Sequence, residues 1–440
     1  MSKYSKYPSY KDSGVEWLGE IPEGWEDYRI DWVNTIIRGN TGFKKDELLN
    51  TGEYVALQYG KTYRVDEING TFKYYVNSEF YKPSQVVNYG DTIFISTSET
   101  VKDLGHSCFY SRSDLGLIGG EQILLKPNAK VLFDKYFYFY SKVFSNELRR
   151  YATGLKVFRF NIDDLKNIFI SLPPLQEQKA IATYLDRATQ KIDTLIAKQS
   201  SLIALLKEKR QALISHAVTK GLDSDAKMKE SGVAWLGEIP EGWEVGLLSS
   251  LFINNKVKNT GMKNSNLLSL SYGKIIRKSI DTNTGLLPAN FESYQILKRG
   301  YIVLRLTDLQ NDKKSLRVGF VREEGIITSA YVGLAKKSDS IGNEKYFYYY
   351  LHTFDIHKGF YGMGAGVRQG LNFDELKKLK FLLPPTQEQD KIVEYIERQT
   401  QKIDTLITKA TEAITLLKEK RTALISAVVT GKVDVRGEVA

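Results

Sequence analysis

Few residues of this chain belong to the types that build metal sites or disulfides. Its 440 residues include one cysteine and four histidines. The single cysteine, Cys108, excludes an internal disulfide and fits a reducing compartment. His352 and His357 are five positions apart, a spacing that does not place them on one helix face, and the histidines form no convincing metal pair. The sequence therefore predicts no metal site built from cysteine and histidine.

Long apolar runs are also missing. The first residues, MSKYSKYPSY, lack the apolar core of a signal peptide. No stretch approaches the roughly 18 consecutive apolar residues that suggest a membrane-spanning helix. We therefore expect a soluble, cytoplasmic protein.

The common motifs of catalytic sites are incomplete. Gly60-Lys61-Thr62 resembles the end of a phosphate-binding loop, but Val55 stands where that loop needs its first glycine. Both Pro-Pro pairs follow leucine, so the Asn-Pro-Pro-aromatic signature of an amino-methyltransferase is absent, and there is no Pro-Asp dipeptide of the kind found in restriction-nuclease cores. One glycine-rich stretch does not fit the dinucleotide-binding spacing: Gly362, Gly364, Gly366 and Gly370. The sequence predicts no catalytic centre.

A long helical segment occurs twice. Residues 172–219 align without a gap to residues 383–430, and 31 of the 48 positions are identical. Each copy opens with Leu-Pro-Pro, and Gln-Glu-Gln follows in the next turn, which are expected signals for a helix start. The pattern predicts helices from about Gln176 to Val218 and from about Gln387 to Val429.

Apolar residues recur in both helices at alternating steps of four and three, which is typical of a coiled-coil seam. The predicted seam residues are Ile181, Leu185, Ile192, Leu195, Leu202, Leu206, Leu213, Ile392, Ile396, Ile403, Leu406, Leu417 and Leu424. A second, partial stripe widens the apolar face of the first helix: Tyr184, Ile196, Ile203 and Leu205. We expect the two copies to pack against each other in antiparallel fashion. The alternative is that each helix independently mediates oligomerisation.

A shorter repeat precedes each globular segment. Residues 13–26 read SGVEWLGEIPEGWE and residues 231–244 read SGVAWLGEIPEGWE; we call both the tryptophan motif. The chain therefore consists of two half-repeats, each with a tryptophan motif, a globular segment and a long helix. The predicted class is α+β, with an internal pseudo-twofold repeat. The predicted boundaries are 1–170 for the first globular domain, 171–221 for its helix, 222–382 for the second globular domain and 383–440 for the second helix.

The two globular segments share a skeleton but not a surface. Both contain Tyr-Gly-Lys (59–61 and 272–274), a glycine before a β-rich run (Gly90 and Gly300) and an aromatic block (136–140 and 346–350). The aromatic blocks could stack on bases, but their setting favours a place in the core. A net charge of +10 and a pI near 9.1 are compatible with a polyanionic partner.

These motifs resemble those of a known family. The tryptophan motif, the Leu-Pro-Pro-x-Gln-Glu-Gln helix start, and TQKIDTLI and LLKEKR in both halves look like the specificity subunit of a type I restriction-modification system. In the second half, NLLSLSYGKIIRKSIDTNTGLLP, RLTDLQNDKKSLRVG and GAGVRQGLNFDELKKLK are similar to a recurrent target-recognition domain of that family. The resemblance covers essentially the whole chain.

The resemblance implies a sequence-specific subunit that binds double-stranded DNA and has no catalytic role. Two target-recognition domains would each read one half of a bipartite, asymmetric target, and the paired helices would act as a spacer. Two methyltransferase subunits would dock on the helices and repeated regions, and two ATP-driven restriction subunits would join them. S-adenosylmethionine, ATP and magnesium would then belong to the partner subunits.

Candidate DNA contacts are polar residues on loops that follow β-rich runs, because base edges are read by such side chains. The candidates for base readout are Thr97, Ser98, Glu99 and Thr100 in the first segment and Arg305, Thr307, Asp308, Gln310 and Asn311 in the second. The candidates for phosphate or guanine contacts are Lys61, Arg64, Lys156, Arg159, Lys274, Arg277, Arg317 and Arg368.

Three other interpretations remain open at this point. A stand-alone DNA-binding regulator would bind its target tightly without a partner, whereas wide apolar helix faces favour docked subunits. A scaffold coiled coil with no role on DNA would leave unexplained the six of the ten net positive charges that lie outside the two long helices. An enzyme with an unfamiliar site is the third.

Overall fold

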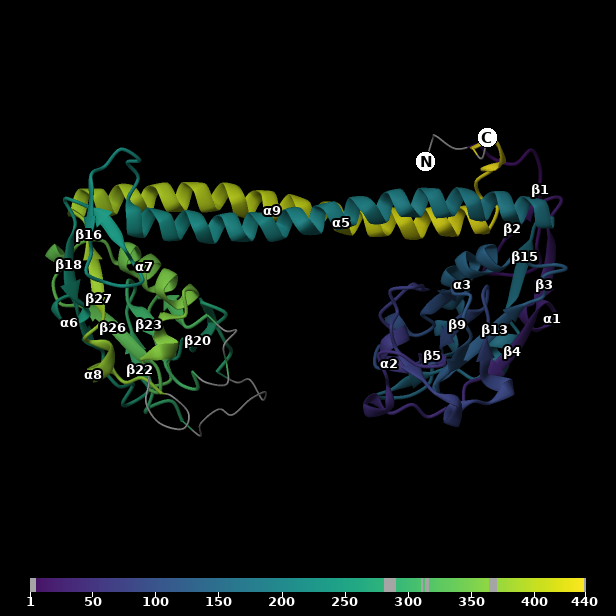
Figure 1. The fold of residues 1–440 in the computed structure, drawn as a ribbon, viewed down its shortest axis with the longest axis horizontal. Helices are drawn as coiled ribbons and strands as arrows, with labels where there is room; N and C mark the ends of the chain where they lie inside the picture. Colours follow the sequence, from purple (N-terminus) through teal and green to yellow (C-terminus); the bar gives the residue numbers. More distant parts are fainter. Residues whose placement is uncertain (1–4, 281–289, 310–311, 313–315, 364–369, 439–440) are drawn as a thin grey trace. The chain divides into compact units, whose positions relative to one another are not determined.

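The computed structural model describes residues 5–280, 290–309, 312, 316–363 and 370–438. The chain divides into two compact units, and we call Met1–Gln199 with Glu412–Ala440 unit 1 and Ser200–Thr411 unit 2. The two long helices, α5 (Leu175–Lys220) and α9 (Thr386–Val429), each contribute one part to each unit (Figure 1). Each unit also holds one globular module of mixed helices and strands, module 1 (residues 5–174) or module 2 (residues 221–385), so the predicted α+β class is confirmed.

Module 1 is built on two β-sheets. The larger sheet has the order β4 (Asn34–Arg38), β13 (Gln122–Pro127), β9 (Thr92–Ile95), β11 (Ser107–Tyr110) and β6 (Glu67–Ile68). The smaller sheet has the order β7 (Tyr75–Val76), β5 (Tyr54–Leu57), β12 (Gly116–Ile118) and β8 (Val86–Val87). Three two-stranded ribbons complete it: β1 (Tyr10–Asp12) with β2 (Glu20–Pro22), β3 (Glu26–Arg29) with β15 (Phe169–Leu172), and β10 (Thr97–Ser98) with β14 (Phe158–Arg159).

Module 2 repeats this plan, with fewer paired strands among its described residues. Its main sheet has the order β19 (Phe252–Asn254), β26 (Val332–Lys336), β23 (Ile302–Leu304) and β24 (Val318–Phe320). Its two-stranded sheets are β16 (Met228–Glu230) with β17 (Glu238–Pro240), β18 (Glu244–Leu247) with β27 (Lys380–Leu383), β20 (Leu268–Ser271) with β21 (Lys274–Arg277), and β22 (Gln295–Leu297) with β25 (Gly325–Ile327).

One helix in each module lies between the main sheet and the long helices (Figure 1). These are α3 (Asp134–Leu148) and α7 (Glu344–Ile356); the short helices are α1 (Ile30–Val33), α2 (Tyr59–Thr62), α4 (Ile162–Lys166), α6 (Leu248–Leu251) and α8 (Phe373–Leu376). The aromatic blocks lie on α3 and α7, where Tyr136, Tyr140, Tyr346 and Tyr350 are fully buried. The prediction that these blocks belong to the core is therefore confirmed.

The shared skeleton extends to backbone conformation. Gly90 and Gly300, which precede the equivalent strands β9 and β23, both have φ of +91°, a region that favours glycine. A Cβ atom on either glycine would press against the first acidic residue of the neighbouring helix, Asp134 or Glu344. In each module, therefore, glycine occupies the position before the strand where the backbone passes close to the start of the neighbouring helix.

In unit 1, α5 and α9 run antiparallel. Leu185 of α5 shares a core cluster with Ile425 of α9. Further along α5, Asp193 is paired with Arg421, which precedes Ile425 on α9, at 3.0 Å between Oδ1 and Nε. Residue numbers thus rise along α5 while they fall along α9. The hydroxyl of Tyr136 on α3 donates to the last carbonyl of α9, that of Val429, over 3.1 Å.

Unit 2 contains the reciprocal arrangement, with the second half of α5 against the first half of α9. Arg210 of α5 lies 3.5 Å from Asp404 of α9, and Val218 further along α5 shares a core cluster with Ile392, nearer the start of α9. Arg210 and Asp404 occupy the same repeat positions as Arg421 and Asp193, so one cross-helix pair is made twice. The predicted antiparallel packing is confirmed in each unit by itself.

The seam differs from the predicted one in the middle of each helix. Leu195, Leu202 and Leu406, predicted as seam residues, are exposed, with Leu406 half accessible to solvent, whereas Ile196, Ile203 and Ile407 are partly buried. The other predicted seam residues are buried or partly buried: Ile181, Leu185, Ile192, Leu206, Leu213, Ile392, Ile396, Ile403, Leu417 and Leu424. An extra step of four residues, from Ile192 to Ile196, shifts the contact line by one position, because two adjacent apolar stripes were available to it.

The repeated Gln-Glu-Gln sequence anchors each long helix to its module. In unit 1 the indole nitrogen of Trp25 donates to Glu177 over 3.2 Å, and the amide of Gln178 donates to the Pro173 carbonyl over 2.9 Å while accepting from the Phe133 N–H over 2.8 Å. The same contacts recur in unit 2, where Trp243 donates to Glu388, Gln389 donates to Pro384 and Gln389 accepts from Asn343. The two buried glutamines therefore join a helix start, the Pro-Pro turn and the start of α3 or α7.

We predict that Gln178→Ala destabilises unit 1. The substitution leaves the Phe133 N–H and the Pro173 carbonyl without their side-chain partner, and such losses typically cost about 1–3 kcal/mol. Gln176→Ala is the matched control, because Gln176 lies in the same helical turn and is exposed; changes there are usually within about 0.5 kcal/mol. Urea unfolding of the full chain would measure both, and equal midpoints for the two variants would contradict the assigned role of Gln178.

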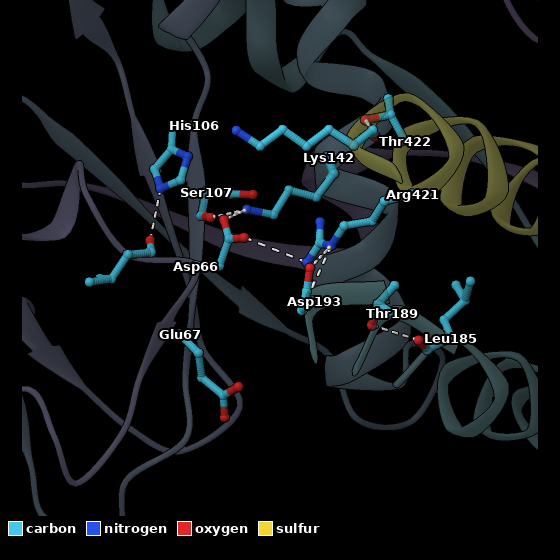
Figure 2. A network of polar contacts seen from close by, with 12 residues as sticks. Asp66, Glu67, His106, Ser107, Lys142, Leu185, Thr189, Asp193, Arg421 and Thr422 are labelled. Carbon is cyan, nitrogen blue, oxygen red and sulfur yellow. Dashed lines mark hydrogen bonds and ion pairs between the residues drawn. The ribbon is translucent and has the colours of Figure 1, made fainter. Parts of the chain in front are cut away.

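A network of ion pairs joins module 1 to the long helices (Figure 2). The Asp66 carboxylate accepts from Lys142 of α3 over 2.7 Å and lies 3.5 Å from the Arg421 guanidinium of α9. Arg421 also pairs with Asp193 of α5, and Lys142 donates to the Ser107 carbonyl over 2.5 Å. Burial by itself would raise the pKa of Asp66, but the charges of Lys142 and Arg421 hold that pKa below its ordinary value.

We predict that Arg421→Met lowers the stability of unit 1 by about 1 kcal/mol at neutral pH, the upper range for partly exposed ion pairs. Because the pKa of Asp66 is lower in the folded chain than in the unfolded chain, its contribution is present above the ordinary aspartate value of about 3.9 and is lost as the pH falls through the folded value. The difference in the free energy of unfolding between wild type and variant, measured by urea unfolding at several pH values, should therefore narrow below about pH 4. Arg398→Met, at an exposed site of the same helix, is the control; a gap that widens in acid would refute the assignment.

Candidate nucleic-acid interface

Two groups of candidate residues in module 1 meet on one short ribbon. β10 pairs antiparallel with β14, which places Thr97 opposite Arg159 and Ser98 opposite Phe158. The candidates at 97–100 and at 156–159, far apart in the sequence, therefore lie side by side.

The third candidate group of module 1 is tied to the same ribbon. The hydroxyl of Tyr59 in α2 donates to the Thr97 carbonyl over 2.9 Å, and the hydroxyl of Tyr63 is 2.9 Å from the Ser98 Oγ. Arg64 is exposed beside them, while the Lys61 ammonium lies over the Tyr74 ring at 4.4 Å from its centre. Both cations therefore belong to one continuous region with the ribbon.

The structure corrects the role of two residues in this region. Thr97 and Ser98 are buried, and Ser98 Oγ also accepts from the Thr100 N–H over 3.1 Å, so their side chains support the loop and do not face a ligand. Glu99 and Thr100 are exposed, and Thr100 caps the following turn by accepting from Asp103 N–H over 3.3 Å. Of the four candidates in this loop, Glu99 and Thr100 are thus the accessible ones.

The hairpin that carries Lys156 and Arg159 also presents an apolar tip that sequence reasoning missed. Thr153 and Arg159 exchange backbone hydrogen bonds of 2.8 and 2.9 Å, and Gly154 has φ of +120°, where a Cβ would collide with the Val157 carbonyl. Leu155 follows it and is 98% exposed. The sequence signal that could have predicted this exposed tip is a leucine that stands between a glycine and Lys156 in a polar loop.

In module 2, Lys274 and Arg277 lie on the second strand of the β20–β21 hairpin. The turn of this hairpin is Tyr272-Gly273, and Tyr272 is 79% exposed with φ of +46°, a conformation that bulky residues rarely adopt. Lys274 is exposed next to it. The Arg277 guanidinium is paired with Glu323, which limits its freedom to bind another group.

The shared Tyr-Gly-Lys sequence thus has two different structures. In module 1 it forms α2 after β5, with Tyr59 partly buried. In module 2 it forms the exposed turn between β20 and β21. Equivalent sequence positions therefore present different shapes.

The remaining candidates of module 2 follow β23. Thr307 and Asp308 are exposed, the flanking Leu306 and Leu309 are buried, and Asp308 has φ of +57°. The guanidinium of Arg305 is paired with the Asp312 carboxylate. We call residues 305–309 the β23 corner.

Arg317 is the clearest correction among the candidate cations. It is fully buried, and its guanidinium donates to main-chain carbonyls of the β23 corner and to the Tyr361 hydroxyl. A phosphate or guanine contact, as predicted, would need an accessible side chain. Gln310, Asn311 and Arg368 lie outside the described residues.

Within the described ranges, no group of three or more His, Cys, Asp or Glu side chains is arranged to hold a metal ion. The Cys108 thiol is buried, which raises its pKa to about 12 and keeps it protonated at neutral pH. In the same part of the chain, no helix is long and apolar enough to span a membrane.

Comparison with known proteins agrees with the repeat. Residues 22–204 and 240–416 each match the protein family described as type I restriction modification DNA specificity domain. The MjaVIII specificity subunit of a type I restriction enzyme from Methanocaldococcus jannaschii is 25% identical over 432 residues, covering 94% of each chain. The StySPI specificity subunit from Salmonella potsdam is 25% identical over 425 residues, covering 90% of this chain and 86% of the relative.

Solved structures share the fold at lower identity. A chain from the structure described as the structural basis of complex assembly and conformational transition of the type I R-M system has a TM-score of 0.66 at 15% identity, over 93% of this chain and 98% of that one. The HsdS subunit from Thermoanaerobacter tengcongensis has a TM-score of 0.51 at 16% identity, over 94% and 98%. The resemblance noted in the sequence is confirmed: with both repeats matched, the chain belongs to the type I restriction modification DNA specificity family.

Proposed function

We propose that this chain reads a bipartite, asymmetric DNA target and positions adenine methyltransferase and restriction subunits on it. The observation that carries this proposal is the pair of modules with one skeleton and two different exposed surfaces. Module 1 presents Glu99, Thr100 and the Leu155 hairpin, and module 2 presents Tyr272 with the β23 corner. Different surfaces on a repeated frame suit two different half-sites.

The exposed cations supply the sequence-independent part of the proposed binding. Arg64, Lys156 and Arg159 in module 1 and Lys274 in module 2 are exposed near the candidate base-reading groups. Contacts to phosphates position a protein on DNA, whereas contacts to base edges specify the sequence. We assign Glu99, Thr100, Thr307 and Asp308 to the second task.

The long helices support the docking of partner subunits. Several leucines on them are exposed although they lie outside the seam: Leu195, Leu202, Leu205, Leu406 and Leu416. Exposed leucines beside a packed seam suit contact with further helices. We propose that two methyltransferase subunits bind there, with two restriction subunits joining them in the cytoplasm. A stand-alone DNA-binding regulator, which docks no further subunits, would not account for these exposed leucines.

In this proposal the chain itself is not an enzyme. S-adenosylmethionine would be bound by the methyltransferase partner, and ATP and magnesium by the restriction partner. The residues of this chain would select and orient DNA. That division fits the position of its exposed polar residues on loops and hairpin tips, where they are accessible for contact with DNA.

We predict that the purified chain neither methylates nor cleaves DNA. With its methyltransferase partner added, methylated adenines should appear at one bipartite, asymmetric sequence. Single-molecule sequencing of genomic DNA, with and without this gene, would identify the target. Activity of the chain alone, with contaminating partner excluded by mass spectrometry, would refute the proposal.

We predict that Lys274→Ala and Asp308→Ala act differently. Loss of a phosphate contact at Lys274 should weaken binding to all sequences and lower the salt-dependence slope by about 1. Loss of a base contact at Asp308 should relax preference at one base pair, at a cost of about 1–3 kcal/mol. Binding titrations of the complex at several salt concentrations would separate the two, with Lys337→Ala, at an exposed lysine after β26 of module 2, as the control. Identical effects of both variants would contradict the assignment.

A further inference from the structure

We propose that Arg317 is a positioning residue for base reading by module 2: it shapes the β23 corner from inside the module and does not touch DNA. The inference rests on the proposed function, since it takes the β23 corner to face a half-site. It concerns a side chain that is hidden in the fold and that acts through the exposed residues above it.

The guanidinium of Arg317 is saturated by acceptors from its own module. Its five N–H groups match five acceptors, which are the main-chain carbonyls of Arg305 at 3.1 Å, Thr307 at 2.8 Å, Asp308 at 3.2 Å and Asp312, and the Tyr361 hydroxyl at 3.2 Å. Three of these carbonyls, those of Arg305, Thr307 and Asp308, belong to the β23 corner. One rigid, planar group therefore fixes the main chain on both sides of Thr307.

Arg317 is itself held firmly. The main-chain N–H of Arg317 donates to the Asp355 carboxylate of α7 over 2.6 Å. The main-chain carbonyl of Arg317 accepts from the Arg305 N–H over 2.9 Å. The Tyr361 ring lies 5.2 Å from the guanidinium carbon, and the Tyr361 hydroxyl donates to the Asp312 carbonyl over 3.2 Å. The Arg317 guanidinium is thus held in place by α7 and by the segment that follows α7. It fixes the position of the β23 corner relative to both.

The backbone conformation that Arg317 supports is uncommon. Asp308 has a left-handed φ of +57°, a region that residues other than glycine seldom occupy, although aspartate and asparagine do so more often than most. Leu306 and Leu309 are buried on either side, so Thr307 and Asp308 project from a corner with two apolar anchors. The carbonyl contacts of Arg317 lie directly under this corner and offset its unfavourable backbone geometry.

A lysine could not replace this arrangement. Lysine keeps the positive charge but has three donors on one flexible atom, whereas arginine has five in a fixed plane. Sites that discriminate between bases need their side chains held within about 0.5 Å of the productive position. Loss of the guanidinium contacts should therefore reduce discrimination between base pairs more than it reduces overall binding to DNA.

The test is Arg317→Lys in the full chain, assembled with its methyltransferase partner. Methylation rates would be measured on the cognate duplex and on duplexes with single base-pair changes in one or the other half-site. We expect discrimination in the half-site read by module 2 to fall by about tenfold or more, because a base contact made by Thr307 or Asp308 would lose its fixed position. Discrimination in the other half-site, read by the unchanged module 1, should stay as in the wild type.

Two further variants keep the result interpretable. Tyr361→Phe retains the ring but removes the hydroxyl that bridges the Arg317 Nε and the Asp312 carbonyl, and it should relax the same half-site to a smaller extent. Arg299→Lys, at an exposed arginine of the same module, should change neither half-site. The salt-dependence slope should be the same for wild type and Arg317→Lys, because no phosphate contact is lost.

Several outcomes would overturn the inference. A proportional loss of methylation on every duplex, with discrimination intact in both Arg317→Lys and Tyr361→Phe, would make Arg317 a stabilising residue only. A lower salt slope would mean that Arg317 contacts DNA directly. Failure of the proposed function is distinguishable, since then even the wild-type complex would methylate no bipartite target.

Discussion

The seam between α5 and α9 is the contact on which both units depend. Neither long helix covers its module alone: the aromatic helix α3 packs on the first part of α5 and the last part of α9, and α7 packs on the opposite parts. The cross-helix pairs Asp193–Arg421 and Arg210–Asp404 fix the same relative position in each unit. Each module is thus completed by the helix that belongs to the other repeat, which explains why the helix sequences are so much better preserved between the two halves than the loops are.

Most of the framework could be predicted from the sequence, because it rests on strong local signals repeated twice. The ends of the long helices, the buried aromatic blocks and the strands after Gly90 and Gly300 follow from proline and glycine positions and from periodicity. The phase of the seam could not be predicted in the middle of the helices. Leu195 and Ile196, or Leu406 and Ile407, are both apolar, and only the three-dimensional contact decides which of two neighbours turns inward.

The candidate interface was less predictable, for a related reason. A polar residue in a loop is normally predicted to be exposed. Ser98 and Arg317 instead turn inward and bind main-chain groups, the Thr100 N–H and the Thr307 carbonyl respectively. Their other partners come from distant parts of the chain, such as Tyr63 or Tyr361, and periodicity carries no information about them. The exposed tips at Leu155 and Tyr272 were overlooked because apolar and aromatic side chains are normally assigned to a core.

The division of the helices between the units also orders events during synthesis on the ribosome. Unit 2 is one continuous stretch, whereas unit 1 needs α9 residues that emerge about 210 residues after Gln199. At about 5–20 residues per second, the nascent chain carries the uncovered Ile181 and Leu185 for roughly 12–50 s before Ile425 and Val428 of the same cluster are synthesised. In a polysome, the same apolar surface on a neighbouring nascent chain is available throughout that interval. The module that is translated first is the last to be enclosed.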